Sequence, residues 1–356
     1  MVALAAARFA SAAAAKRFGF DPLRADSWIR WDSHWYLRIA EHGYQLRQCP
    51  GGDSNFCGET GWFPGYPTLI SAFVRAGIPP APSGIAIALI AQLVLIVLLW
   101  GAFLDASPSP RNLAALLLAA FFPGAVYCQA VFPISTFLCF ALGFLIACVR
   151  GRWWIAAACG AAASFTYPTG FLLGGVYALW LLVSMPEAQR DWRRLLPIAG
   201  PLVGFAAVFG MMAAQTGVWD AFIKNQAHFG YGLSDPLGTL GSRLAPLTMP
   251  SSATTAALAT AGQTLLVLAL VIGASWVALR ERSRLELVLL GLYTVFYWSF
   301  PLILGGQLSL YRAEALLLPM TVLLAQGPPA LLFAGTASAL FLFLPMAVAF
   351  FQGVLV

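Results

Sequence analysis

The sequence predicts an all-α polytopic membrane protein. Of its 356 residues, 60% are hydrophobic and only 10% are Asp, Glu, Lys or Arg, whereas charged residues make up roughly a quarter of a soluble domain. Residues 82–104 and 112–149 contain no charge, and a helix needs about 20 apolar residues to cross the hydrocarbon core. The formal net charge of +6 therefore concerns the loops beside the spans, and we expect no nucleic-acid partner.

About eleven spans are expected. The Ala-rich N-terminal stretch is interrupted by Arg8 and lacks the Leu-rich core and cleavage site of a signal peptide, so it is interpreted as a short first span. The remaining expected spans are 82–104, two in 112–149 that break near 131–133, two short ones in 153–186 that break at Tyr167–Pro168, 195–214, 256–279, 287–304, 313–326 and 329–350. A single transmembrane domain is expected over residues 1–356.

The arginines of the short loops predict the orientation in the membrane. Four short loops on one side carry nine of them: Arg111, Arg150, Arg152, Arg190, Arg193, Arg194, Arg280, Arg282 and Arg284. On the other side lie residues 19–81, residues 215–255 and a short loop near 305–312, where basic residues are sparse and mixed with acids. Because loops rich in Lys and Arg stay in the cytoplasm, we expect these three segments at the outer face of a cell membrane.

The stretch WDSHWYLRIAEHGY, residues 31–44, gathers ionisable and aromatic side chains. It has no Pro and no Gly before Gly43, so it predicts a helix that Asp26 or Ser27 would cap, lying at the membrane surface. Helical spacing places Asp32 with Trp35, Tyr36 and Ile39 on one face, and Arg38, Glu41 and His42 on the other side. A carboxylate among apolar neighbours suits a general base that acts on a hydroxyl group. The alternative is that Asp32 caps the helix or pairs with Arg30.

Two further patterns in residues 19–81 concern metals and cysteines. His34, His42 and Glu41 do not have the spacing of a defined metal site, so no metal is expected. Cys49 and Cys57 bracket the polar loop CPGGDSNFC and would form a disulfide in an oxidising compartment, the alternative being two free thiols. The other cysteines lie in apolar segments and are interpreted as buried: Cys128, Cys139, Cys148 and Cys159.

Three more segments are candidates for binding. GWFPGYP, residues 61–67, predicts either a rigid re-entrant turn or a simple interfacial turn. The amphipathic stretch 219–232 carries four polar candidates: Asp220, Lys224, Gln226 and His228. GGQLSLYRAEALLLP, residues 305–319, places Arg312 at the mouth of a span, where its guanidinium suits a phosphate. The alternative is contact between Arg312 and Glu314 or a lipid headgroup.

Several of these motifs together resemble the PIG-V-like mannosyltransferases, a family that includes the second mannosyltransferase of glycosylphosphatidylinositol assembly and bacterial relatives. RWDSHWYLRIAEHGY followed by WFPGYPTLI is similar to the family's Trp-Asp, Tyr-Leu-x-Ile-Ala-x-x-Gly-Tyr and Phe-Phe-Pro-x-Tyr-Pro pattern. Further similar segments follow in the family's order: FFPGAVYCQAVF (121–132), YPTGFLL (167–173), FIKNQAHFG (222–230) and LSLYRAEALLLP (308–319). Two positions depart from the pattern, since Ile134 stands where many relatives have Glu and Tyr167 where they often have Arg.

The resemblance implies a GT-C-type glycosyltransferase fold of about 10–11 transmembrane helices with its site in the outward loops. It implies a polyprenyl-phosphate sugar donor, inversion at the sugar and catalysis by Asp32. We expect substrate contacts from nine residues: Trp31, His34, Arg38, Glu41, Tyr66, Gln226, His228, Tyr311 and Arg312. No cofactor is required, because a carboxylate base and an arginine suffice for the chemistry.

The leading hypothesis is therefore a multi-pass membrane glycosyltransferase that moves a hexose, with mannose expected first, to a glycan, lipid or protein acceptor. A transporter or lipid flippase is the competing class. Such proteins usually have mid-span ionisable groups and repeated halves, and neither is evident here. A catalytically silent partner subunit is the third hypothesis, raised by Ile134 and Tyr167.

Overall fold

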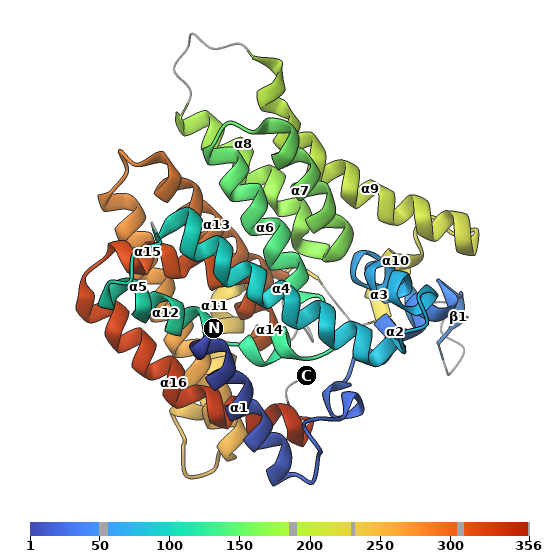
Figure 1. Cartoon of the computed structure of the whole chain (residues 1–356), viewed down its shortest axis with the longest axis horizontal. Helices are drawn as coiled ribbons and strands as arrows, with labels where there is room; N and C mark the ends of the chain where they lie inside the picture. Colours follow the sequence, from blue (N-terminus) through green and yellow to red (C-terminus); the bar gives the residue numbers. More distant parts are fainter. Residues whose placement is uncertain (50–55, 105, 185–190, 229–231, 305–309, 355–356) are drawn as a thin grey trace. The chain divides into compact units, whose positions relative to one another are not determined.

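The computed structural model describes residues 1–49, 56–104, 106–184, 191–228, 232–304 and 310–354 (Figure 1). Arg190, the interior of the loop CPGGDSNFC and residues 305–309 of the expected outer loop lie outside these ranges. The helices are α1 (Val2–Arg17), α2 (Ser33–His42), α3 (Gly65–Arg75), α4 (Pro80–Phe103), α5 (Pro110–Ala120), α6 (Ile134–Val149), α7 (Trp153–Thr166), α8 (Leu172–Ser184), α9 (Leu196–Thr216), α10 (Ala221–His228), α11 (Pro236–Leu244), α12 (Thr255–Arg280), α13 (Leu285–Leu304), α14 (Leu310–Glu314), α15 (Thr321–Gln326) and α16 (Pro329–Gln352).

Short elements complete the described chain. The 3₁₀ turns are η1 (Ala25–Trp28), η2 (Glu59–Gly61), η3 (Ala125–Gln129), η4 (Pro168–Phe171), η5 (Trp192–Leu195), η6 (Ala245–Leu247) and η7 (Ala315–Met320). Strands β1 (Arg47–Gln48) and β2 (Phe56–Cys57) pair antiparallel, with Arg47 opposite Cys57 and Gln48 opposite Phe56. This hairpin is the one sheet in the described residues, so the predicted all-α class is confirmed.

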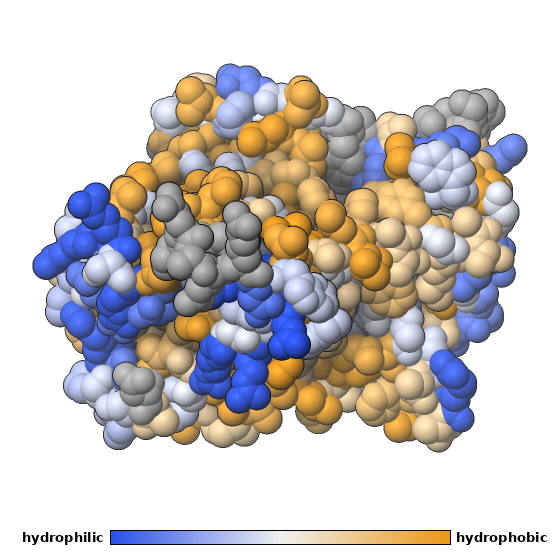
Figure 2. Space-filling model, turned by 90° about the horizontal axis from the view of Figure 1, so that it is seen from above, coloured by the Kyte–Doolittle hydropathy of each residue, from blue (hydrophilic) through white to orange (hydrophobic). Residues whose placement is uncertain are grey.

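Long apolar helices confirm a multi-pass membrane protein. In the described ranges, five helical segments are long and apolar enough to cross a membrane: α4, η5 with α9, α12, α13 and α16. In the most apolar stretch of each segment, half or fewer of the residues are buried within the protein. Large apolar side chains such as Ile90, Ile272 and Phe341 are exposed on these helices, and Figure 2 shows hydrophobic residues over much of the face that it draws. Lipid is the medium in which such exposed apolar surface is stable.

The shorter expected spans take a more broken form. The break expected near 131–133 is a longer irregular region, since α5 ends at Ala120 and α6 begins after Pro133. The break at Tyr167–Pro168 is confirmed, because Tyr167 is extended between α7 and η4. The segment 313–326, expected as one span, is helical along its whole length but is not one regular α-helix. That segment is divided into α14, η7 and α15, with Pro319 inside η7, and a proline removes a helical hydrogen bond.

The chain forms two compact units, each drawn from separate parts of the sequence. The first unit comprises residues 1–27, 93–129 and 233–356, and the second comprises residues 28–92 and 130–232. In the first unit, α12 packs against α13, α15 and α16, and α1 and α5 pack against α16. In the second unit, α7 lies between α6 and α9 (Figure 1).

Small residues allow α7 and α9 to approach closely in the second unit. A Cβ atom at Gly200 would overlap the backbone of Ala157, and one at Gly204 would overlap the backbone of Ala161. Glycines spaced four apart on one helix face are the usual device for close packing of membrane helices. The C-terminal half of the long helix α9 carries Val208, Met212 and Gln215, which contact residues of the segment between α2 and α3.

Candidate active site

Asp32 lies at the start of α2 in an unusual backbone setting. Trp31, the residue before it, has φ of 44°, a left-handed conformation that non-glycine residues rarely adopt. This turn separates η1 from α2, so the predicted capping of the helix by Asp26 or Ser27 is wrong. Asp32 occupies the N-cap position, but its side chain makes no capping hydrogen bond to the helix. The half-buried carboxylate is thus not used to cap α2, which was one of the two alternative roles considered for it.

The buried face of α2 fixes the position of the Asp32 turn. Tyr36 packs edge-on against Tyr66, with ring centroids 5.7 Å apart, and against Phe132 at 6.2 Å. Trp28 is fully buried, and its carbonyl oxygen accepts a hydrogen bond from the amide of Val131 at 3.3 Å. The turn that carries Asp32 is therefore held from both sides by aromatic residues of the same unit.

Tyr66 is part of this packing and does not line an open site. It is 0% exposed, and its hydroxyl donates to the carbonyl oxygen of Gly84 at 2.7 Å. The segment 61–67 forms a turn that leads into a helix. It runs from η2 through extended Trp62 into α3, for which Pro64 is the N-cap residue. A proline at a helix start removes no needed donor, which explains why this aromatic, Pro-rich stretch begins a helix.

A second cluster, which the sequence did not reveal, surrounds Glu59. Its carboxylate is 1% exposed and accepts hydrogen bonds from two arginines. The Arg38 Nε atom lies 3.0 Å from Oε1, and the Arg47 Nε atom lies 3.0 Å from Oε2. Arg38 also lies over the Trp35 ring at 5.7 Å, and that ring stacks on Trp62 at 5.3 Å. Glu59 is surrounded in the sequence by small and polar residues and is far from its partners, so no local pattern identifies it.

The 39–63 region docks onto α9. Ile39, Tyr44 and Phe63 form a buried apolar cluster with Val208 and Met212 of α9. The Tyr44 amide donates to Gln215 Oε1 at 2.8 Å, and its hydroxyl donates to the Trp62 carbonyl oxygen at 2.7 Å. Burial raises the pKa of the Tyr44 hydroxyl, so this group remains a donor. These contacts hold the loop after α2 against a long apolar helix.

The other predicted residues of α2 are distributed over its exposed surface. His34 is exposed, its Nδ1 atom contacts the Trp31 carbonyl oxygen, and its ring lies 4.5 Å from that of Trp35. Glu41 and His42 are exposed at the end of the helix. The predicted face containing Arg38, Glu41 and His42 is therefore the more accessible one, although these residues do not converge with His34 on a metal site.

The polar residues of α10 tie residues 219–228 to η2. Buried Asn225 donates through Nδ2 to Thr60 Oγ1 at 3.1 Å and to the Gly58 carbonyl oxygen at 3.3 Å. Gln226 donates through Nε2 to the Gly61 carbonyl oxygen at 3.2 Å. The candidate Gln226 is thus near the 58–61 segment, but Asn225, which was not a candidate, is the more deeply buried link.

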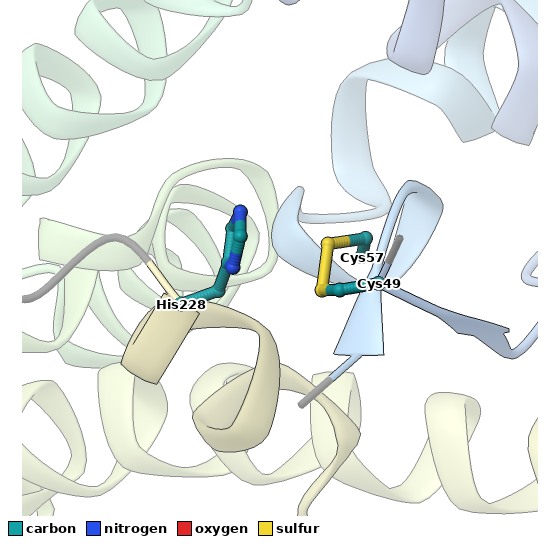
Figure 3. A group of neighbouring side chains, drawn as sticks. All are labelled: Cys49, Cys57 and His228. Atoms are coloured by element: carbon teal, nitrogen blue, oxygen red, sulfur yellow. A yellow bond between two sulfur atoms is a disulfide. The ribbon is translucent and has the colours of Figure 1, made fainter. Parts of the chain in front are cut away.

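Cys49 and Cys57 form a disulfide across the β1–β2 hairpin. His228 of α10 lies beside it (Figure 3), and the two sulfur atoms and a ring nitrogen lie within 4.8 Å of one another. This is the one such group of possible metal ligands within the described ranges. Cysteine binds a metal ion as the thiolate, and both sulfur atoms are joined in the disulfide, so these residues do not fit a metal ion in this form.

The late candidates, Tyr311 and Arg312, belong to the other unit. Tyr311 is 8% exposed, and its hydroxyl accepts a hydrogen bond from Arg243 Nη1 at 3.3 Å. Glu314 is buried and accepts a hydrogen bond from Gln263 Nε2 at 2.6 Å. Arg312 is half-buried. Sequence reasoning missed Arg243 and Gln263, each more than 45 residues from its partner.

The two departures from the family pattern lie in apolar surroundings. Ile134 is fully buried at the first position of α6. Tyr167, which follows α7, packs its ring 5.5 Å from that of Phe137 in α6.

Comparison with known proteins gives the fold class. No protein-family model and no curated protein matches the sequence. The structure resembles the crystal structure of ArnT from Cupriavidus metallidurans in the apo state, with a TM-score of 0.53 and 16% sequence identity over 82% of this chain. This likeness concerns the fold: the present chain is an all-α polytopic membrane protein whose GT-C-type fold is shared with ArnT. The chain spans about half the length of ArnT, covering 53% of it.

Proposed function

We propose that this protein is a membrane glycosyltransferase that transfers a hexose, with mannose the first candidate, from a polyprenyl-phosphate donor to an acceptor. The GT-C fold shared with ArnT supports the reaction class. Within the chain, the observation that carries the proposal is the placement of Asp32. Asp32 follows a left-handed residue, makes no side-chain hydrogen bond that caps α2, and precedes a helix whose Tyr36 packs against buried Tyr66. Backbone strain that the surrounding structure maintains is concentrated at functional sites in proteins.

The proposed reaction is one displacement at the anomeric carbon. An acceptor hydroxyl attacks that carbon, the bond from the carbon to the phosphate oxygen breaks, and the polyprenyl phosphate leaves with its electron pair. Asp32 takes the proton of the attacking hydroxyl, and the configuration at the sugar is inverted. For Arg312, phosphate binding is proposed from its residue type and sequence context alone, because a guanidinium stabilises negative charge on phosphate oxygens. Trp31, His34, Gln226 and His228 are proposed to contact the sugars.

The location proposed for this chemistry is the outer face of the membrane. Residues 19–81 and 215–255 form the outward segments in this proposal, as the distribution of arginines predicts. The disulfide between Cys49 and Cys57 supports it, since disulfides persist in oxidising compartments. The acceptor is a glycan, lipid or protein, and the whole chain forms one transmembrane glycosyltransferase domain.

Sugar transfer by the purified full chain in lipid tests the proposal. Radiolabelled polyprenyl-phosphate-mannose is offered with a membrane extract as the acceptor source. We expect labelled product from the wild type and a loss of at least a hundredfold with Asp32→Asn. Asp26→Asn is the matched control, because Asp26 lies near Asp32 in sequence, is exposed and pairs only on the surface with Arg24. Full activity of Asp32→Asn would refute its role as base.

A second candidate, the catalytically silent partner subunit, is favoured by one observation. Ile134 and Tyr167 replace two charged residues of the family pattern and lie in apolar contacts. If the purified chain transfers no mannose and no other hexose, but restores transfer to an incomplete membrane extract, this second function replaces the first. Movement of the intact labelled lipid across the bilayer without product would instead indicate a flippase.

A further inference from the structure

The Glu59 cluster has more positive charge than its carboxylate requires. Glu59 is 1% exposed, and a buried carboxylate is costly unless a cation pairs with it. One arginine would balance that single charge. Two are present, since Arg38 and Arg47 both donate to the same carboxylate through their Nε atoms. Among the residues that the structure describes in this cluster, the two guanidinium groups and the one carboxylate leave one positive charge in excess.

The two guanidinium groups contact Glu59 through their Nε atoms. Their Nε atoms face Glu59, while the side chains of Arg38 and Arg47 remain 40% and 41% exposed. Arg47 Nη2 donates to Gln45 Oε1 at 2.7 Å. Arg38 Nη1 and Nη2 and Arg47 Nη1 have no hydrogen-bond acceptor among the residues that the structure describes. Glu41 lies about one helical turn from Arg38. In the part of the chain that the structure describes, however, Arg38 forms its salt bridge with Glu59.

The support of the two arginines is rigid. Arg38 rests on the Trp35 ring, which in turn stacks on Trp62. The backbone on either side of Glu59 is tied to α10 by the two hydrogen bonds of Asn225, to Gly58 and to Thr60. Arg47 lies in β1, opposite the disulfide residue Cys57. Both guanidinium groups are therefore oriented before any ligand arrives, which lowers the entropy cost of binding.

We propose that Arg38 and Arg47 together form a binding site for an anionic oxygen group, a phosphate or a carboxylate. Guanidinium groups bind such oxygens in pairs through their N–H forks, and the excess positive charge favours an anion over a neutral ligand. Glu59 is the positioning residue that holds both arginines, and it does not contact the ligand. The site is additional to the proposed transferase function and is measured by binding alone, so its failure is distinguishable from a failure of sugar transfer.

The experiment measures binding of inorganic phosphate and of acetate to the purified full chain in lipid nanodiscs, by calorimetry and tryptophan fluorescence. We expect saturable phosphate binding that weakens as the NaCl concentration rises. Arg38→Gln and Arg47→Gln should each weaken it about tenfold or more, as expected for loss of hydrogen bonds between charged groups. Arg38→Lys and Arg47→Lys keep the charge beside Glu59 but lose the fork, and should retain the fold with part of the affinity.

Arg75→Gln is the matched control, because Arg75 is an exposed arginine of the same unit that donates a hydrogen bond within its own helix, to the Ser71 carbonyl oxygen. Equal phosphate affinity in the wild type and in all four Arg38 and Arg47 variants would overturn the proposal. So would an equal loss in Arg75→Gln, or no anion binding by the wild type.

A competition experiment identifies the source of the anion. Polyprenyl phosphate is added to the nanodiscs, and inorganic phosphate binding is measured again. Displacement that is lost in Arg47→Gln would assign the site to a lipid-linked headgroup. Phosphate binding that persists at saturating polyprenyl phosphate would assign it to a water-soluble anion, such as an acidic group on an acceptor. Both outcomes support the anion site and differ only in where the ligand comes from.

Discussion

Trp31 shows how a single backbone angle bears on the candidate base. Its φ of 44° lies in the left-handed region, where L-residues other than Asn and Asp are strained and glycine is not. We therefore expect Trp31→Gly to be more stable than Trp31→Ala by about 1 kcal/mol, because both variants lose the indole and only glycine relieves the strain. Thermal unfolding of the two purified variants measures the difference. A more stable alanine variant would show that position 31 is unstrained.

Glu59 allows a second test at the residue scale. Glu59→Gln keeps the shape of the side chain but leaves Arg38 and Arg47 beside a neutral amide. We expect the free energy of unfolding to fall by about 2 kcal/mol, which is less than for a fully buried pair because both arginines are half-exposed. Chemical unfolding in detergent measures it. Glu41→Gln, an exposed carboxylate on the same region, should change little, and an equal loss in both variants would contradict the role assigned to Glu59.

The residues of the site differ in how far the sequence could predict them. The helix over 33–42 was predictable because its stretch lacks Gly and Pro and alternates buried and exposed positions with a helical period. The N-cap residue of this helix, Asp32, was not predictable, because its place depends on the left-handed backbone at Trp31. Tryptophan rarely adopts that conformation, so the sequence gives no signal for it. Glu59 pairs with arginines 21 and 12 residues away, and Asn225 bonds to Gly58 across 167 residues. Contacts of that range require the tertiary fold.

At the scale of elements, the crossing of α7 and α9 depends on the absence of side chains. Gly204→Ala would place a methyl group against the Ala161 backbone, so we expect a loss of about 1–3 kcal/mol in the free energy of unfolding. Gly210 is on the same helix, and a Cβ atom added there would have no described neighbouring atom within 4 Å. Gly210→Ala should be neutral or stabilising, since alanine favours helix more than glycine does. Thermal unfolding in detergent compares the two, and equal losses would argue against close packing at Gly204.

Element boundaries were predictable where proline or charge marks them. Tyr167–Pro168 ends α7 as expected, because the residue before proline disfavours the helical conformation. The irregular helix over 313–326 was not predictable in the same way. Hydropathy reports that a segment is apolar, and this one is apolar because it is almost completely buried within its own unit. Burial in protein and burial in lipid select the same residues, so composition alone could not separate them.

At the scale of the whole molecule, the class was predictable and the division into units was not. Low charge and long apolar runs determine a polytopic helical protein almost by themselves. The two units, however, interleave along the chain, and the division falls within α4, between Gln92 and Leu93. No composition shift marks that point, which lies in the middle of an uninterrupted apolar helix. Asp32 and Arg312, the two main candidates, consequently belong to different units.

The orientation of the chain in the membrane is the last prediction, and the proposed function depends on it. Nine arginines in four short loops place those loops in the cytoplasm, so residues 215–255 should face outward. Single-cysteine variants test this with a membrane-impermeant maleimide. Ser252→Cys should be labelled in intact cells, and Arg282→Cys only after permeabilisation, since both positions are exposed on opposite predicted sides. The wild type provides the background from the native cysteines, of which Cys49 and Cys57 are joined in a disulfide. The reverse labelling would place residues 19–81 with Asp32 in the cytoplasm, where a reducing environment disfavours that disulfide, and would exclude sugar transfer at the outer face.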